Sequence, residues 1–161
     1  MRKTEVLTPN QWRELRDLRL AALLDSPEMF LSTYDHESGF SHDQWRAEFE
    51  RGEWHACHAS GRLIGLLGIT REPDTPTDLR YLEYLWVSPT YRRSGIAHHM
   101  LSFALDTLRA TGIRTVLLWV LDGNDSAVRL YQKLGFVKTD YSQRLAERPG
   151  RIEEQMMLTL A

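Results

Sequence analysis

The segment Val87-Ser88-Pro89-Thr90-Tyr91-Arg92-Arg93-Ser94-Gly95-Ile96-Ala97 lies between an apolar run that ends at Val87 and an apolar helical pattern that begins near Ile96. A strand that passes into a helix through such a loop points free backbone N–H groups at one place, where the positive end of the helix dipole also lies. Arg92 and Arg93 add charge-assisted donors that suit a phosphate group. The segment therefore predicts an anion site, although an ordinary solvated turn before a helix has the same composition.

The overall composition is that of a soluble globular protein. The 161 residues suffice for a single domain, 1–161, and 42% of them are apolar and 26% charged. A net charge of −2 and a pI of about 6.3 argue against nucleic acid or a membrane surface as partner, because both need a broad basic face. The N-terminus lacks the apolar core of a signal peptide, and no apolar run approaches the roughly 20 residues that span a bilayer. A cytoplasmic location is expected.

Hydrophobic spacing predicts the order of strands and helices. Strands are expected at 4–7, 54–59, 63–70, 79–87, 115–120, 136–145 and 151–160, and helices from Thr8-Pro9, from Pro27, and over 41–50, 96–108 and 124–134. Antiparallel strands lead into a strand–helix–strand crossover, which should be parallel and right-handed. The predicted fold class is α/β: a single domain with a mixed central sheet of about seven strands and helices on both faces.

A second motif follows the strand that ends at Val120. It reads Asn124-Asp125-Ser126-Ala127-Val128-Arg129-Leu130-Tyr131-Gln132-Lys133-Leu134-Gly135-Phe136. The arrangement Arg92-x-x-Gly95-x-Ala97 resembles the pyrophosphate-binding loop of the GNAT acetyltransferase superfamily, and this second motif resembles the other GNAT signature. The resemblance is good over 63–136, and the segments 16–23 and 26–30 are similar to the acceptor-side helices of many bacterial members. Arg93 and Ala97 stand where the family more often has glycine.

The resemblance implies that the cosubstrate is acetyl-coenzyme A and that no metal is needed. It implies that the pyrophosphate lies against the loop residues, which are Arg92, Arg93, Ser94, Gly95, Ile96 and Ala97. The pantetheine arm would pair with the backbone of Leu85, Trp86 and Val87, as an added strand does. Asn124 and Ser126 would contact the coenzyme, and Tyr131 would also donate a proton to its sulfur. Two simpler interpretations stay open: Tyr131 as a core residue of an amphipathic helix, and Asn124 as a helix N-cap.

A proton acceptor is needed because an amine must be neutral to attack a thioester. The candidate is Glu83, a carboxylate in an apolar strand, where burial should raise its pKa. Its side chain is expected on the face of the strand opposite to those of Tyr84 and Trp86. The simpler alternative is a carboxylate that pairs structurally with an arginine. Phe30 and Tyr34 are candidates for the acceptor cleft.

Other reactive residues fit less well. Cys57 is the single cysteine, so no intrachain disulfide can form, and a strand places His58 on the face opposite to Cys57. That geometry argues against both a cysteine nucleophile and a metal site at His55, Cys57 and His58.

The predicted function is transfer of an acetyl group to a primary amine of a small molecule, peptide or protein, by direct attack in a ternary complex. A noncatalytic acyl-CoA-binding sensor or interaction module on the same fold is the alternative. A longer acyl donor or a hydroxyl acceptor is a third option. A homodimer through the last strands is possible.

Overall fold

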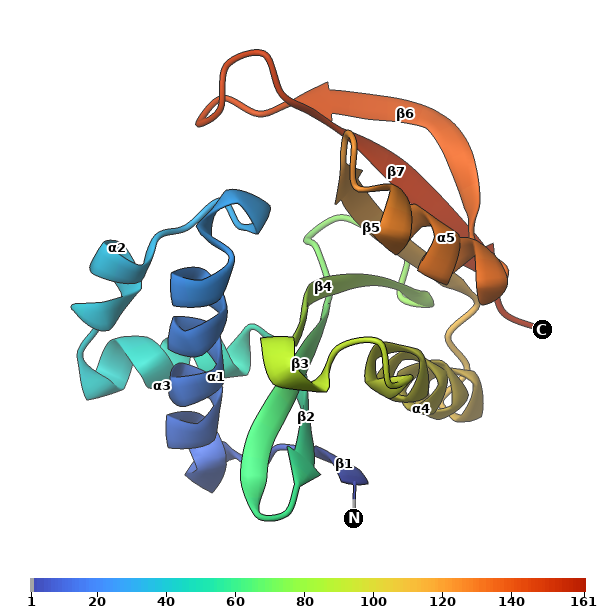
Figure 1. The fold of residues 1–161 in the computed structure, drawn as a ribbon. Helices are drawn as coiled ribbons and strands as arrows, with labels where there is room; N and C mark the ends of the chain where they lie inside the picture. The colour runs from blue at the N-terminus through green and yellow to red at the C-terminus, as the bar shows by residue number, and fades with distance from the viewer. Residues whose placement is uncertain (1) are drawn as a thin grey trace.

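The computed structural model describes residues 2–161 and contains one seven-stranded mixed sheet with helices on both faces (Figure 1). The strands are β1 (Arg2–Val6), β2 (Gly52–Ala59), β3 (Arg62–Thr70), β4 (Leu79–Val87), β5 (Thr115–Leu121), β6 (Val137–Arg144) and β7 (Ile152–Thr159). The helices are α1 (Trp12–Asp25), α2 (Tyr34–Ser38), α3 (His42–Glu50), α4 (Ile96–Ala110) and α5 (Asp125–Lys133), with 3-10 turns at Pro9–Gln11, Pro27–Met29 and Pro89–Tyr91.

The strands lie in the order β1-β2-β3-β4-β5-β7-β6, and only the β4–β5 pair is parallel. This confirms the predicted fold class and the parallel pairing across α4. Helix α2 was not predicted, because its five residues are too few to show a period. Its start carries a local signal all the same, since the Thr33 side chain accepts a hydrogen bond from the His36 N–H at 3.2 Å.

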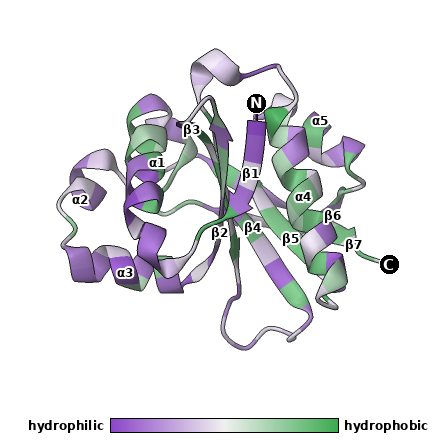
Figure 2. Ribbon diagram, turned by 90° about the horizontal axis from the view of Figure 1, so that it is seen from below, coloured by the Kyte–Doolittle hydropathy of each residue, from purple (hydrophilic) through white to green (hydrophobic). Residues whose placement is uncertain are grey.

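Two apolar cores lie on opposite faces of the sheet. One core packs α4 against the sheet and includes Met100 and Leu101, which are fully buried. The other packs α1 and α3 against the sheet and includes Trp45 and Trp54, each 1% exposed. Figure 2 shows the two helical layers on either side of the sheet, with α1, α2 and α3 on one side and α4 and α5 on the other. The alternation of apolar residues along the central strands places them in these two cores.

Strands β4 and β5 separate soon after they start. Their pairing runs from Leu79 opposite Thr115 to Tyr81 opposite Leu117 and then ends. Residues 82–87 of β4 therefore have no strand partner on the β5 side. This separation leaves a free strand edge inside the fold, next to the start of α4.

A β-bulge interrupts β4 after Glu83. Gly68 of β3 pairs with Glu83 of β4, and Leu66 of β3 pairs with Trp86 of β4. The two pairs are thus two positions apart on β3 but three positions apart on β4. The extra residue changes the alternation of side chains, because Tyr84 has a left-handed φ of 57°. Such a conformation costs about 1–3 kcal/mol in a non-glycine residue and persists only where the surroundings enforce it.

The bulge corrects one expectation from the sequence. A strict alternation would place Glu83 on the face opposite to Tyr84 and Trp86. Instead, Glu83 pairs with Gly68, and a Cβ added to Gly68 would point at Trp54, which lies on the α1 face. Tyr84 and Trp86 also belong to the core on that face. All three side chains thus lie on the α1 face. Across residues 2–161, no helix has the length and apolar character needed to cross a membrane.

Candidate active site

A cleft of about 900 Å³ opens beside the free edge of β4. The end of β4, the start of α4, one side of α5 and the segment that follows α1 form its walls. The lining residues are Ser26, Glu28, Met29, Phe30, Leu85, Trp86, Val87, Tyr91, Arg92, Arg93, Gly95, Ile96, Ala97, His98, Asn124, Ser126, Ala127, Leu130 and Lys133. The two sequence motifs, which are about thirty positions apart, therefore meet at one cavity of the size that small-molecule sites have.

The loop between β4 and α4 presents a row of unbonded N–H groups. Arg93 and Gly95 have left-handed backbone angles, with φ of 60° and 80°. Within the described chain, the N–H groups of residues 93–98 donate to no backbone carbonyl. A Cβ on Gly95 would meet nothing within 4 Å, so the glycine is required by its φ and not by lack of space. Free N–H groups at a helix start attract an anion.

Arg92 lines the cleft but uses its guanidinium within the protein. Its Nε donates to the Val87 carbonyl at 2.9 Å, and its Nη2 donates to Asp25 Oδ2 at 2.6 Å. Trp86 Nε1 and Ser26 Oγ donate to the Asp25 carboxylate at 3.0 and 2.7 Å. These hydrogen bonds, with that from Trp86 first, and the charge of Arg92 lower the pKa of Asp25. Asp25 thereby ties the end of α1 to the end of β4.

Asn124 and Ser126 line the cleft at the start of α5. The Asn124 side chain caps the helix, because its Oδ1 accepts from the Ala127 N–H at 3.4 Å. The Ser126 hydroxyl donates to the same oxygen at 3.3 Å. The N-cap interpretation of Asn124 is therefore correct, and it is compatible with a ligand contact because both side chains face the cavity.

Tyr131 is half-buried on α5 and is not among the residues that line the cleft. Its ring packs edge-on against Phe136, with 5.8 Å between the ring centres. Burial raises the pKa of Tyr131 to about 12, so its hydroxyl stays protonated at neutral pH. A protonated phenol is the form that can donate a proton, and the proton-donor role stays a prediction.

Glu83 also does not line the cleft. Burial and the neighbouring charge of Glu72 raise the pKa of Glu83, while the cations Arg51 and Arg19 act in the opposite direction. No ion pair joins Glu83 to an arginine within residues 2–161. A raised pKa brings a carboxylate closer to the range of a general base. Its role as the base stays a prediction.

The segment Ser26–Phe30 forms the cleft wall that faces the two motifs. Arg148, in the loop between β6 and β7, donates to the carbonyls of Pro27, Glu28 and Phe30 and so holds this segment. Of these residues, sequence reasoning singled out only Phe30 as a site candidate. Pro27 was expected to begin a short helix, and the structure has a 3-10 turn there, at Pro27–Met29. The resemblance of 26–30 to acceptor-side helices was the other signal in this segment. Nothing in the spacing around Arg148 indicated a contact there.

Phe30 and Tyr34, the two predicted acceptor residues, are placed differently. Phe30 lines the cleft and stacks on Tyr84, with 6.3 Å between ring centres and 13° between ring planes. Tyr34 begins α2, is 38% exposed and does not line the cleft. The structure therefore brings Phe30, but not Tyr34, to the cavity.

Cys57 is fully buried in β2, and burial raises the pKa of its thiol, which opposes formation of the nucleophilic thiolate. In the part of the chain that the structure describes, no group of three or more His, Cys, Asp or Glu side chains is arranged to hold a metal ion.

Comparison with known sequences identifies a shared family. A family model described as the acetyltransferase (GNAT) family matches residues 12–136. The N-alpha-acetyltransferase RimI of Mycobacterium tuberculosis is 34% identical over 88 residues, which cover 55% of this chain and 54% of that protein. The mycothiol acetyltransferase of Streptosporangium roseum is 39% identical over 54 residues, which cover 34% of this chain and 16% of that protein. The chain thus spans about half the length, or less, of these curated relatives.

Solved structures share the fold over the whole chain. An acetyltransferase of the GNAT family from Streptococcus pneumoniae superposes with a TM-score of 0.80 at 20% identity and covers 100% of both chains. The yncA protein of Salmonella typhimurium, solved with its cofactor acetyl-CoA, has a TM-score of 0.80 at 16% identity, covering 100% of this chain and 95% of that one. At these identities the likeness concerns the fold alone.

Proposed function

The chain belongs to the GNAT family of acetyltransferases, and from this premise we propose that it is an acetyl-CoA-dependent N-acetyltransferase acting on a primary amine. The observation that carries the proposal is the row of unbonded N–H groups at residues 93–98, which opens into a cleft beside a strand edge without a partner. A diphosphate fits the first feature, and an amide-containing arm fits the second.

The cleft has two walls with different tasks. The acceptor wall consists of the lining residues Ser26, Glu28, Met29 and Phe30. The coenzyme wall consists of the other lining residues, which are Leu85, Trp86, Val87, Tyr91, Arg92, Arg93, Gly95, Ile96, Ala97, His98, Asn124, Ser126, Ala127, Leu130 and Lys133. Along the coenzyme wall, the diphosphate accepts hydrogen bonds from the loop N–H groups, and the pantetheine amides pair with the backbone of Leu85–Val87. Arg93 is exposed at the cleft and has no ion-pair partner within the described residues, so it can add a donor to a phosphate oxygen.

The reaction is the attack of a neutral amine nitrogen on the acetyl carbonyl carbon. A carbon–nitrogen bond forms, the carbon–sulfur bond breaks, and the coenzyme leaves as a thiolate. The Tyr131 hydroxyl donates its proton to that sulfur. The amine releases one proton, which passes through water to Glu83. The raised pKa of Glu83 supports its role, because it makes the carboxylate a stronger proton acceptor than a free glutamate. The pKa of about 12 keeps Tyr131 protonated at neutral pH, so its proton is present when the thiolate leaves.

The acceptor is an amine of a small molecule, peptide or protein, and it enters along the acceptor wall. The name of the relative RimI, an N-alpha-acetyltransferase, makes an N-terminal amine one class to include in an acceptor screen. We further propose that the chain acts as a single domain in the cytoplasm, because it carries one sheet and no helix suited to cross a membrane among its described residues.

A second function, a noncatalytic acyl-CoA sensor, is favoured by one observation. Neither Tyr131 nor Glu83 lines the cleft, so the cavity can bind a coenzyme without either group contacting it. The sensor and the enzyme share the coenzyme wall and differ only in turnover.

Two measurements test the proposal. Coenzyme A at about 100 times its Kd should raise the free energy of unfolding by about 2.7 kcal/mol and the Tm by roughly 5–10 °C. Acetyl-CoA with an amine panel should then release free thiol, and Tyr131→Phe should slow release about 100-fold with little change in coenzyme Kd. No Tm shift at millimolar coenzyme would refute both functions. A Tm shift without thiol release would support the sensor.

A further inference from the structure

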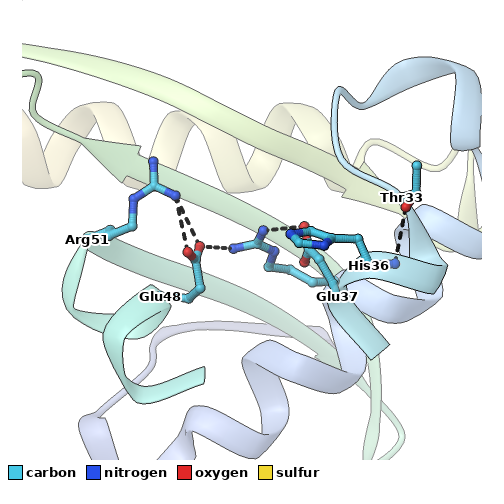
Figure 3. A network of polar contacts seen from close by, with 6 residues as sticks. Thr33, His36, Glu37, Glu48 and Arg51 are labelled. Atoms are coloured by element: carbon cyan, nitrogen blue, oxygen red, sulfur yellow. Dashed lines mark hydrogen bonds and ion pairs between the residues drawn. The ribbon is translucent and has the colours of Figure 1, made fainter. Parts of the chain in front are cut away.

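A buried ion network joins the three helices on the α1 face of the sheet. Arg19 of α1 donates to Glu37 of α2 at 2.6 Å and to Glu48 of α3 at 2.8 Å. Arg51 donates to both oxygens of the same Glu48 carboxylate, at 3.1 Å to Oε2, which Arg19 also bonds, and at 3.3 Å to Oε1 (Figure 3). Arg19 is 3% exposed and Glu37 is 1% exposed. A single guanidinium therefore holds α2 and α3 against α1.

The same guanidinium lies against the ring of Tyr84. Its central carbon is 4.5 Å from the centre of the Tyr84 ring and 5.7 Å from those of Trp45 and Trp54. The Trp54 ring lies 5.4 Å from the Tyr84 ring. A cation over an aromatic face is attracted more strongly where water is excluded, as it is here. The Tyr84 ring is thus held by the guanidinium of Arg19 and by the ring of Trp54.

Tyr84 is the residue that forms the bulge in β4. Its φ of 57° is unfavourable for tyrosine and needs support from its surroundings. The segment that follows it, Leu85–Val87, is the part of β4 that lines the cleft. The position of that segment therefore depends on the bulge, and the bulge depends on what holds the tyrosine ring.

We propose that Arg19 is a positioning residue for the coenzyme: by holding Tyr84 in the bulge, it fixes the Leu85–Val87 edge against which the pantetheine arm lies. This inference rests on the proposed function. Arg19 does not line the cleft, so its effect on the Leu85–Val87 edge is carried by the tyrosine. Phe30, which stacks on Tyr84, extends the same support to the acceptor wall.

A purely stabilising role explains the network less well. Arg19 Nε and Glu37 Oε1 are buried and have no hydrogen-bond partner within residues 2–161. A buried ion pair with unpaired atoms contributes little compared with apolar residues of similar volume. The network is better explained by the backbone conformation that it enforces, which is the bulge at Tyr84.

The test uses two ligands that share a diphosphate. Coenzyme A carries the pantetheine arm, whereas ADP does not. The double variant Arg19→Met with Glu37→Gln removes the cation without leaving Glu37 charged and unpaired. Isothermal titration calorimetry should show that the variant binds coenzyme A about tenfold more weakly and ADP within about twofold of the unmodified protein.

A matched pair at the tyrosine covers the case in which the double variant does not fold. Tyr84→Phe keeps the aromatic face and should bind coenzyme A like the unmodified protein. Tyr84→Leu removes that face and should lose about tenfold in coenzyme A affinity while keeping ADP binding. Far-UV circular dichroism confirms that each variant is folded before titration.

The outcomes separate this inference from the proposed function. Equal loss of affinity for both ligands would overturn the positioning role. Unchanged coenzyme A affinity would overturn it too, whether in Tyr84→Leu or in the folded double variant. Failure of the unmodified protein to bind coenzyme A would instead overturn the proposed function, on which the inference rests.

Discussion

The coenzyme wall of the cleft is built from main-chain groups in segments that are continuous in sequence, whereas the acceptor wall is a short segment held from far away. The N–H groups of residues 93–98 need only the end of β4, the loop and the start of α4 to form. The segment Ser26–Phe30 is held by Arg148, which is 118 to 121 positions distant from the carbonyls it bonds.

The two walls therefore differ in how they respond to changes of side chain. Backbone donors can bind a diphosphate whatever the neighbouring side chains are, so we expect the coenzyme wall to tolerate changes such as Ala97 in place of glycine. The acceptor wall depends on single side chains from distant elements, so small changes there can alter which amine is accepted. If the two walls act separately, a change in one wall should leave binding at the other wall unchanged.

The largest expected effect is at Gly95, on the coenzyme wall. Gly95→Val forces a β-branched residue to a φ of 80°, which costs about 1–2 kcal/mol and disturbs the loop. Loss of two charge-assisted hydrogen bonds to the diphosphate corresponds to roughly 100-fold weaker coenzyme binding. Calorimetric titration with coenzyme A measures the loss.

The matched control is Gly61 in the turn between β2 and β3. Its φ is 77°, and a Cβ there also meets nothing within 4 Å. Gly61→Val should therefore reduce the free energy of unfolding by a similar amount, yet leave coenzyme binding unchanged. If both variants lose coenzyme affinity equally, the N–H groups of the loop are not the binding site.

Much of the coenzyme wall was predictable because its signals are local. The bounds of β4, Leu79–Val87, follow from an apolar run between turn residues, and Gly95 was named from the motif Arg92-x-x-Gly95-x-Ala97 that follows this strand. The bulge at Tyr84 was not predictable, because a tyrosine gives no sign that its φ will be positive. The predicted face of Glu83 was wrong for that reason.

The acceptor wall was only partly predictable from the sequence. The resemblance assigned 26–30 to the acceptor side, and this segment does line the cleft, but among its lining residues only Phe30 was named as a site candidate. Arg148 bonds backbone carbonyls, which every residue has, so the partner segment carries no matching residue type. A contact of this kind depends on how the last two strands are placed, and no spacing pattern reports that placement.

Arg148→Ala should affect the acceptor wall alone. Loss of its three hydrogen bonds to the carbonyls of 27, 28 and 30 frees the segment, and we expect the KM for the amine to rise about tenfold, which corresponds to about 1.4 kcal/mol. The Kd for coenzyme A should stay within about twofold. Steady-state kinetics with a saturating donor and calorimetry with coenzyme A measure the two quantities.

Arg144→Ala provides the control for removal of an arginine from the same part of the chain. Arg144 is exposed at the end of β6 and makes no hydrogen bond or ion pair with its side chain among the described residues. It should change neither the amine KM nor the coenzyme Kd. A parallel loss of coenzyme affinity in Arg148→Ala would show that the walls are coupled.

Glu28→Gln should have a smaller effect on the acceptor wall. Glu28 is exposed, lines the cleft and forms no ion pair within residues 2–161, so its charge is free to attract an ammonium group. The amine KM should rise about threefold at low salt, and this difference should vanish at about 0.5 M salt because exposed charges are screened. Salt-independent kinetics would exclude an electrostatic role.

Asp25 joins the walls, and Asp25→Asn should have the smallest effect, on stability. The hydrogen bond from Trp86, with those from Ser26 and Arg92, lowers the pKa of Asp25. A lowered folded-state pKa stabilises the protein above the unfolded-state pKa, near 3.9, and this contribution is lost as pH falls through the folded-state value. Asp25→Asn should therefore reduce the free energy of unfolding by about 1 kcal/mol or less at pH 7, since the carboxylate is partly exposed.

The loss of unfolding free energy in Asp25→Asn should depend on pH, and this dependence identifies its cause. Urea unfolding of the unmodified protein and of Asp25→Asn should give a constant gap between pH 7 and about pH 5, and the gap should shrink below about pH 4. Asp17→Asn, at an exposed carboxylate of the same helix bonded only to its neighbour Arg16, should give no such profile. A gap that persists unchanged at pH 3 would mean that the shape of the Asp25 side chain, and not its charge, holds the end of α1 to β4. The walls would then be joined by packing, and a change in pH would leave their separation intact.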